Sequence, residues 1–462
     1  MTRKQTAEGV AKHFRRSWLR SEQALPRRVV RPLERYLQQE AGSASLLLAA
    51  AVAALVWANV SPDSYIDLWS TVVSVDFGPL LIEEDLTHWI NDLLMAVFFY
   101  VVALEVKREM VFGSLRDRRS AAVPAAAALG TMVGAALTYA AVNLIGDGDP
   151  RGWAIPIATD IAFAVGVLGL AGRRAPTELR AFMLTLAVVD DLGTIVIIGV
   201  FFTQDLSLIW LAAAVAVSFA VVVAQRVGIR SLVLYVLLAG LLWLAVFESG
   251  VHATLAGVVL GFLTPAVAFH SRQATAEFLG AHLSEISSAD RDVSEGALFE
   301  SSRLAGEAVS PLTRMEERLH PWSAYAILPL FALANAGIPV SFDGIADALS
   351  GPVGLGIALG LVVGAPIGGI LFAWGLIRFG PGRMPDGLDW PAIGGVAPLK
   401  GIGFTIAIFI STLAFEEVDL QEQAKLAILV ASAVAALIGL AALYGRAAML
   451  NRRAIAPPPL RE

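Results

Sequence analysis

Three aspartates and one lysine interrupt long apolar runs of this sequence. Asp160 follows Thr159 in one run, Asp190 and Asp191 lie side by side in the next, and Lys400 precedes Gly401-Ile402-Gly403 in a third. One charge at the centre of a lipid bilayer costs about 2.5–3.5 kcal/mol even on lenient scales. Groups this expensive are functional by default in a membrane protein, so these four residues are the first candidates for chemistry.

Carboxylate and hydroxyl oxygens suit hard cations such as sodium, and the same carboxylates also bind protons. We therefore predict a Na⁺ site at Asp190 and Asp191, supported by Thr159 and Asp160. Adjacent helical residues point about 100° apart, so one member of the pair can face a cavity while the other faces a neighbouring helix. A site that holds either Na⁺ or H⁺ is an exchanger in principle. The alternative is that these carboxylates are structural and tied to neighbouring helices.

Lys400 lies beside two glycines, each of which costs about 1 kcal/mol in a helix interior. We expect the helix to break here, and a second break beside Thr159 and Asp160. Half-helix ends carry dipoles that need compensating charge. The alternative for Lys400 is a lysine whose stem reaches to the membrane surface.

The composition places all these residues in a membrane. The 462 residues are 56% hydrophobic and 16% charged, with a mean hydropathy of +0.68, whereas soluble domains carry about 25% charged residues. The apolar runs are long enough for helices of roughly 20 residues. We predict an all-α membrane protein with twelve transmembrane helices, at residues 44–60, 88–109, 121–145, 153–173, 177–202, 207–226, 230–247, 251–267, 322–340, 353–378, 389–414 and 424–445.

Loop charges predict the orientation and the domain organisation. Alternate loops are rich in arginine, and the positive-inside rule then places both termini in the cytoplasm of a multi-pass inner-membrane protein. We expect a basic tail at 1–43, a membrane domain at 44–445 and a second tail at 446–462. The β-branched stretch inside the external loop 61–85 suggests a short hairpin. The cytoplasmic loop 268–320 is long and carries mixed charges.

Other polar groups lie nearer the span ends. Asp92 is near the start of the second predicted span, Glu105, Arg108 and Glu109 are near its end, and His252 is at the outer end of the eighth. Such groups more often form solvated ends or satisfied structural pairs than sensors. The chain has no cysteine, which excludes thiolate metal sites and disulfides, and the histidine spacing does not indicate a zinc site.

Six sequence blocks resemble the NhaA family of sodium/proton antiporters. They are Leu104–Glu109 (LEVKRE), Ala158–Gly166 (ATDIAFAVG), Val189–Gly193 (VDDLG), Gly250–Gly257 (GVHATLAG), Leu328–Gly337 (LPLFALANAG) and Gly401–Ile410 (GIGFTIAIFI). The resemblance runs from about residue 40 to 445, in family order. It implies inverted-topology repeats with discontinuous helices 4 and 11 crossing at the midplane, alternating access, and a homodimer joined through the 61–85 hairpin.

The resemblance also implies roles for individual residues. Asp190 and Asp191 would bind the ion and the proton, Asp191 as the more central ligand, with Thr159 and Asp160 at the crossing. Asp92 would support the fold or the ion passage. Five residues would fall at positions tied to pH response: Glu105, Arg108, Glu109, His252 and Glu316. The expected function is pH-regulated exchange of Na⁺ or Li⁺ for H⁺, serving pH homeostasis, with no cofactor, no enzymatic reaction and no nucleic-acid partner.

The sequence departs from the family at the counter-charge. Many members carry a lysine in span 10 that pairs with the first aspartate, whereas this chain has Ala365 there and Lys400 in span 11. We hypothesise that Lys400 takes over the missing cation's role, because an unpaired buried carboxylate costs several kcal/mol. The loop 268–320 is also longer than is usual in the family.

Three other functions compete. A sodium-coupled symporter of an organic anion on a related fold would need a roomy basic cavity. An intramembrane aspartyl protease would place its aspartates on separate helices, one in a Gly-x-Gly-Asp motif, whereas Gly403 is followed by Phe404. A channel would not need buried proton-binding groups.

Overall fold

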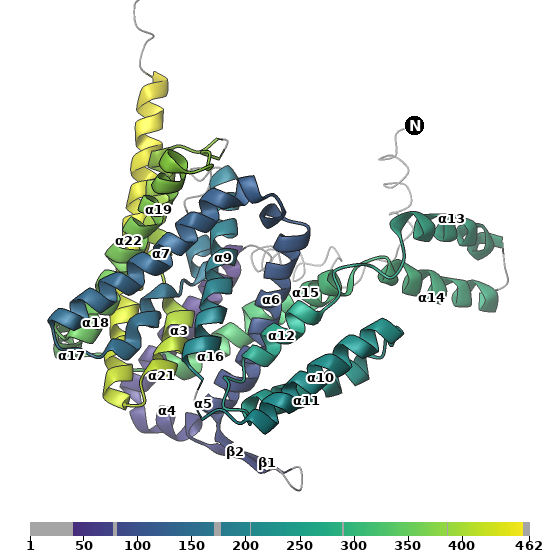
Figure 1. The fold of residues 1–462 in the computed structure, drawn as a ribbon, viewed down its shortest axis with the longest axis horizontal. Coiled ribbons are helices and arrows are strands. Elements are labelled where there is room, and N and C mark those ends of the chain that lie inside the picture. The colour runs from purple at the N-terminus through teal and green to yellow at the C-terminus, as the bar shows by residue number, and fades with distance from the viewer. Residues whose placement is uncertain are drawn as a thin grey trace, which may run out of the picture.

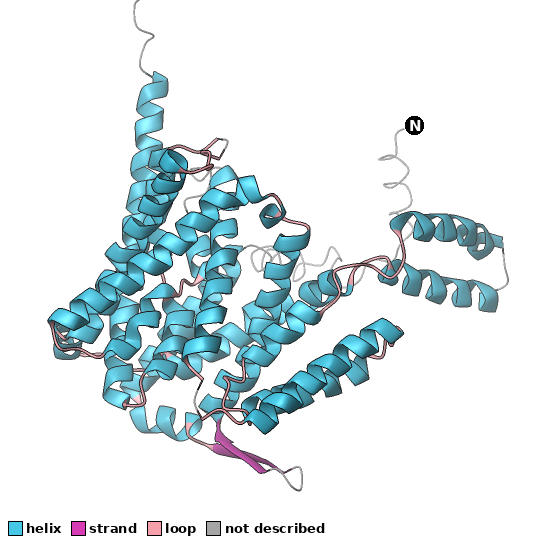
Figure 2. Ribbon diagram, in the orientation of Figure 1, coloured by secondary structure: helices cyan, strands magenta, loops and turns pink. Residues whose placement is uncertain are grey.

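The protein is a bundle of helices with one short hairpin at its edge (Figures 1 and 2). The computed structural model describes residues 40–76, 81–170, 177–203, 205–288, 291–385 and 387–455. The predicted tail at 1–43 lies almost wholly outside these residues, as does the end of the second tail.

The first half of the chain contains α3 (Glu40–Val60), α4 (Pro62–Trp69), β1 (Val72–Asp76), β2 (Leu81–Asp85), α5 (Leu86–Trp89), η3 (Ile90–Leu94), α6 (Met95–Val111), η4 (Ser114–Arg116), α7 (Arg118–Ile145), η5 (Pro150–Ile157), α8 (Ile161–Leu170), α9 (Thr177–Phe201), α10 (Leu208–Val227) and α11 (Leu232–Phe247). The second half contains α12 (Leu255–Leu263), α13 (Arg272–Ser288), α14 (Arg291–Glu307), α15 (Pro311–Trp322), η7 (Ser323–Ile327), α16 (Leu328–Asn335), α17 (Phe342–Ser350), α18 (Pro352–Leu359), η8 (Gly360–Gly364), α19 (Ala365–Phe379), α20 (Trp390–Val396), η9 (Ala397–Gly401), α21 (Phe404–Ala414) and α22 (Val418–Ile455).

Each of the twelve predicted spans overlaps a helix, but fewer of these helices are long enough to cross a membrane. In the described residues eight helices have the length and apolar composition of a span, or nine if the bent pair Trp390–Gly401 and Phe404–Ala414 is one span. The eighth predicted span is shorter than expected. Residues 251–254 form turns before α12, and Pro265, which cannot continue a helix, follows its end at Thr264. The chain is therefore a mostly helical, multi-pass membrane protein.

The hairpin predicted inside the loop 61–85 is present. Strands β1 and β2 pair antiparallel, with Val72 opposite Asp85. Residues before them form α4, which has Pro62 in its first turn. Tyr65 and Trp69 are buried on one face of α4, and their rings lie 5.4 and 6.5 Å from that of Trp57. The β-branched residues thus form the strand β1 as predicted, and the aromatic residues before them pack as a helix.

The long loop 268–320 is largely helical. It contains α13, α14 and α15, and Figure 1 shows α13 and α14 projecting to one side of the bundle. The hairpin and the C-terminal end of α22 lie at opposite ends of the molecule (Figure 1). Which end faces the cytoplasm stays a prediction.

Helices α7 and α19 pack closely through glycines, and this packing positions the site. A Cβ atom added to Gly134 would lie 2.3 Å from the carbonyl oxygen of Gly364, and one added to Gly130 would lie 2.3 Å from that of Gly368. Small residues four apart let membrane helices approach closely. Ala365, at the position of the family lysine, begins α19 and is only 2% exposed.

Candidate functional site

The fourth span is broken where the sequence predicts it. Helix η5 ends at Ile157, Ala158 has an extended backbone, and α8 begins at Ile161. Asp160 caps α8, because its Oδ1 accepts a hydrogen bond of 3.0 Å from the amide of Phe163. A side chain that caps a helix start satisfies an amide that the helix itself leaves free.

The eleventh span is broken in the same way. Helix η9 ends at Gly401, Ile402 is extended, and α21 begins at Phe404 with a bend of 44° between the two halves. A Cβ atom at Gly401 would lie 2.4 Å from the carbonyl oxygen of Leu361. The glycine is therefore needed for the close approach of two backbones.

The two breaks bind directly to each other. The amide of Asp160 donates to the carbonyl oxygen of Ile402 at 2.7 Å, and the hydroxyl of Thr159 lies 3.1 Å from the carbonyl oxygen of Lys400. Backbone groups that no helix can satisfy must find partners in a membrane. Each break here supplies partners for the other.

Asp160 also binds the second half of span 11. Its Oδ2 accepts hydrogen bonds from the amide of Thr405 at 3.2 Å and from the hydroxyl of the same residue at 2.6 Å. One carboxylate, 2% exposed, thus lies at the start of both α8 and α21. Its negative charge opposes the positive dipole ends of these two helices.

Asp190, on α9, forms an ion pair with Lys400. The lysine and the aspartate side chains are 2% and 1% exposed. The hydroxyl of Thr131 lies 3.2 Å from Oδ1 of Asp190, and that of Thr159 lies 3.3 Å from Oδ2. Lys400 therefore faces a carboxylate inside the protein and does not extend to the surface.

Asp191 contrasts with its neighbour. It is 8% exposed, and no residue of the described part of the chain donates a hydrogen bond to its carboxylate. Nor do three acidic or histidine side chains come together as a metal cage among the described residues. Of the adjacent pair, Asp190 is bound by protein side chains, whereas Asp191 has no hydrogen-bond donor in the described part of the chain.

The residues predicted for pH response divide between two places. Arg108 on α6 binds Glu316 on α15 at 2.5 Å and lies 3.6 Å from Glu109. Glu105 lies 3.7 Å from His320. Burial raises the pKa of Glu316, and the positive charge of Arg108 opposes this. This cluster joins α6 to α15 at one end of α6.

His252 lies elsewhere, with Asp92. Its Nε2 is 3.9 Å from the Asp92 carboxylate, its Nδ1 is 3.0 Å from the hydroxyl of Thr254, and its ring packs against Phe409. Asp92 lies in the π-helical turn η3, and its carbonyl oxygen accepts a hydrogen bond from Trp243. Glu105 lies thirteen positions after Asp92, which is roughly 20 Å along a helix axis at 1.5 Å per residue.

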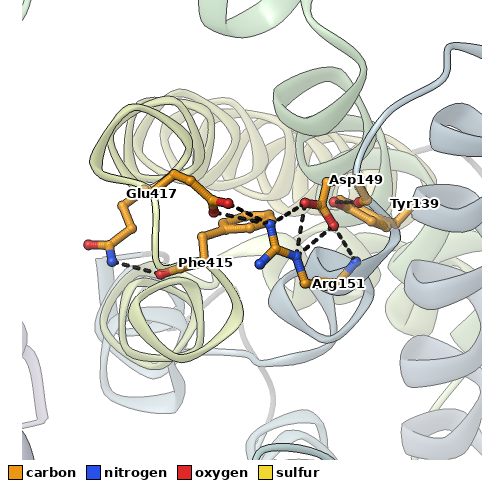
Figure 3. A network of polar contacts seen from close by, with 6 residues as sticks. Tyr139, Asp149, Arg151, Phe415 and Glu417 are labelled. Atoms are coloured by element: carbon orange, nitrogen blue, oxygen red, sulfur yellow. Dashed lines mark hydrogen bonds and ion pairs between the residues drawn. The ribbon is translucent and has the colours of Figure 1, made fainter.

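A network of charged side chains joins the start of span 4 to the end of span 11 (Figure 3). Arg151 on η5 binds Asp149 at 2.6 Å and Glu417, which precedes α22, at 3.0 Å. The guanidinium also lies 5.9 Å from the ring centre of Phe415, and Tyr139 donates to the carbonyl oxygen of Asp149. The first half of span 4 is thereby joined to the end of α21.

Sequence reasoning missed three residues of these clusters. Thr131 lies in an apolar run and carries no charge, so nothing marks it as a partner of Asp190. His320 was hidden in the long loop. Thr405 follows the Gly-Ile-Gly break directly, and a hydroxyl at the start of a predicted half-helix could have been recognised as a capping group.

Comparisons with known proteins identify the family of this chain. Residues 34–443 match the family model described as "Na+/H+ antiporter 1". A protein of Rhodopirellula baltica named "Na(+)/H(+) antiporter NhaA" is 43% identical over 89% of this chain and 93% of its own length. Proteins of the same name from Aeromonas hydrophila and Salmonella typhimurium are 43% and 42% identical over 88% of this chain, covering 94% and 96% of their own lengths. The chain belongs to the Na⁺/H⁺ antiporter 1 family.

Proposed function

We propose that this protein carries out the Na⁺/H⁺ exchange of its family with Asp190 and Asp191 as the groups for which Na⁺ (or Li⁺) and H⁺ compete. The observation that carries this proposal is the difference between two adjacent buried carboxylates. Asp190 is bound to Lys400, whereas Asp191 has no donor in the described part of the chain. Asp191 is the primary ion ligand in this account, and Asp190 joins it when its lysine is displaced.

Competition follows from burial. A carboxylate inside a membrane protein must be protonated, paired or bound to a cation, because an isolated charge is too costly there. Na⁺ bound at Asp191 places a positive charge beside Asp190, which weakens the need for Lys400 and favours release of protons from the site. The reverse sequence, proton binding and Na⁺ release, completes the exchange.

The two breaks provide the hinge for alternating access. They bind each other through Asp160 and Thr159, and each break joins two half-helices, η5 with α8 and η9 with α21. Small rotations about the extended residues would expose Asp191 to one side of the membrane and then the other. The fold we propose is the twelve-helix one of the family, with these helices crossing at the midplane.

Regulation by pH belongs to the second cluster in this proposal. Glu105, Arg108, Glu109 and Glu316 connect α6 to α15, and a glutamate with a raised pKa titrates nearer to neutral pH than an ordinary one. His252 and Asp92 would act in the ion passage at the other end of the same helix. We further propose that both termini lie in the cytoplasm, that the membrane is the inner membrane, and that the hairpin joins two copies.

The test uses purified protein in proteoliposomes with an imposed pH gradient. Adding Na⁺ should dissipate the gradient. Asp191→Asn should abolish this response, since an asparagine side chain does not gain or lose a proton as a carboxylate does. Asp347→Asn, on the exposed face of α17, is the matched control and should behave as wild type. Full exchange by Asp191→Asn would overturn the proposal. A repetition with the membrane potential clamped shows whether the exchange moves net charge.

A further inference from the structure

Thr131, on α7, lies against the proposed proton-binding group but belongs to none of the motifs described above. Its hydroxyl is 3.2 Å from Oδ1 of Asp190, and the residue is 3% exposed. Lys400 and Thr159 both approach the other carboxylate oxygen, Oδ2. Among the described residues, Thr131 is therefore the side chain that hydrogen-bonds to Oδ1.

The Thr131 hydroxyl has two acceptors but a single proton. Its oxygen lies 2.7 Å from the carbonyl oxygen of Ala128 as well as 3.2 Å from Asp190. A hydroxyl donates one hydrogen bond and can accept two, so it can donate to only one of these oxygens at a time. The geometry thus allows two arrangements.

Each arrangement fits one protonation state of Asp190. When Asp190 is ionised, Thr131 donates to Oδ1. When Asp190 carries the proton on Oδ1, the carboxyl group donates to the Thr131 oxygen, and Thr131 donates to Ala128. Rotation of one hydroxyl keeps the buried carboxyl group hydrogen-bonded in both states, and a buried polar group left without a partner is costly.

Asp160 shows the opposite design. Two of its partners are the backbone amides of Phe163 and Thr405, and an amide N–H can donate but never accept. A proton arriving on Asp160 would compete with these amides for the carboxylate oxygens and weaken their hydrogen bonds. The donors around Asp160 suit a permanent acceptor, whereas the hydroxyls around Asp190 suit a group that changes its protonation state. Thr159 adds a second such hydroxyl, shared between Asp190 and the carbonyl oxygen of Lys400.

The position of Thr131 is fixed by the packing of α7 on α19. A Cβ atom at Gly369 would lie 2.8 Å from the methyl carbon of Thr131, so the methyl group fills the space that this glycine leaves. Thr131 and Lys400 also line one small, mainly apolar cavity between α7, α9, α19 and α20. The methyl contact holds the side chain while leaving the hydroxyl free to rotate.

We propose that Thr131 is a positioning residue for proton exchange, which keeps Oδ1 of Asp190 hydrogen-bonded both with and without its proton. This inference rests on the proposed function, in which Asp190 gains and loses a proton during each cycle.

The test compares Thr131→Val, which keeps the shape and removes the hydroxyl, with Thr131→Ser, which keeps the hydroxyl. Thr138→Val is the matched control, because Thr138 lies on the same helix and its hydroxyl bonds to the carbonyl oxygen of Gly134 in the same way, at 2.7 Å. Proteoliposome exchange gives kcat and the KM for Na⁺, and thermal unfolding gives stability.

We expect Thr131→Val to lower kcat about tenfold or more, the fold-change that corresponds to one lost buried hydrogen bond. The KM for Na⁺ should change much less, since Asp191 is the primary ion ligand. Thr131→Ser should keep most of the wild-type rate, Thr138→Val should keep all of it, and the two valine variants should unfold at similar temperatures. If Thr131→Val does not fold, Thr131→Ala and Thr131→Ser give the same comparison, because they differ only by the hydroxyl.

Wild-type kcat in Thr131→Val, an equal loss in Thr138→Val, or a loss in Thr131→Ser as large as that in Thr131→Val would overturn the proposal. The outcome is separable from the fate of the proposed function. Full exchange by Asp191→Asn refutes the function itself, whereas an inactive Asp191→Asn together with a fully active Thr131→Val refutes the role of Thr131 alone.

Discussion

Two clusters of opposite charges involve the broken spans of this protein, and they differ in their access to water: Lys400 of span 11 with Asp190 of α9, and Arg151 of span 4 with Asp149 and Glu417. Lys400 and Asp190 are 2% and 1% exposed. Arg151, Asp149 and Glu417 are 47%, 19% and 54% exposed (Figure 3). In the first pair the cation belongs to span 11, and in the second network it belongs to span 4.

The difference in burial gives the two clusters different energetic roles. An exposed ion pair contributes little to stability, because water and salt screen it. A buried pair is costly to form, and removing one partner costs about 3–5 kcal/mol because the other charge stays behind. We infer that the outer network holds the ends of the half-helices at little energetic cost, whereas the inner pair can be opened only when another cation, Na⁺ or H⁺, replaces the lysine.

The largest effect is expected from breaking the inner pair. Lys400→Ala leaves Asp190 as a buried charge without a counter-charge, so the folded protein should lose about 3–5 kcal/mol of stability or take up a proton instead. The temperature of thermal unfolding in detergent should fall sharply, and the rate of Na⁺-driven exchange should be strongly reduced. Wild-type unfolding and transport in this variant would show that Lys400 is not the counter-charge.

A second substitution sharpens this test. Ala365→Lys in the Lys400→Ala background returns the cation to the position that the family uses, at the start of α19, and removes it from η9. Stability should recover if the requirement is a positive charge beside Asp190, whichever helix supplies it. Failure of the double variant, with a stable Ala365→Lys single variant, would mean that the position of the lysine in span 11 matters in itself.

The smallest effect is expected from Arg151→Gln in the outer network. Hydrogen bonds from Arg151 hold the pKa of Asp149 below its usual range. A lowered folded-state pKa stabilises the fold above the ordinary aspartate value of about 3.9, and this contribution is lost as the pH falls through the lowered value. Arg151→Gln should therefore unfold at nearly the wild-type temperature near neutral pH, and the small difference should vanish in strong acid. If Arg151→Gln lowered the unfolding temperature near neutral pH as much as Lys400→Ala does, the exposed and buried clusters would not differ in their contribution to stability.

The sequence predicts those site residues whose burial in a membrane is energetically costly. Asp160, Asp190, Asp191 and Lys400 are conspicuous because charges are rare in apolar runs. Glycines marked the break in span 11. Uncharged partners are not conspicuous in the sequence. Thr131 is an example, because a threonine in an apolar run is unremarkable and only the fold brings it to Asp190.

Local patterns predicted the strand β1 but not the helix that precedes it. Residues Val72–Asp76 pair as expected, whereas α4 is stabilised by packing of Tyr65 and Trp69 against Trp57. The family resemblance gives His252 and Glu105 the same expected role in pH response, and the structure adds that His252 lies beside Asp92. Distances between helices cannot be read from the spacing of residues along the chain.

The most direct test of the account is proton release on Na⁺ binding, measured with a pH indicator on purified protein in weakly buffered detergent. We predict that Na⁺ displaces protons, and that the apparent affinity for Na⁺ falls about tenfold per unit decrease in pH for each proton displaced, as two ligands that compete for one site require. Na⁺ binding that releases no protons, with an affinity independent of pH, would contradict the central claim that both ions compete for Asp190 and Asp191.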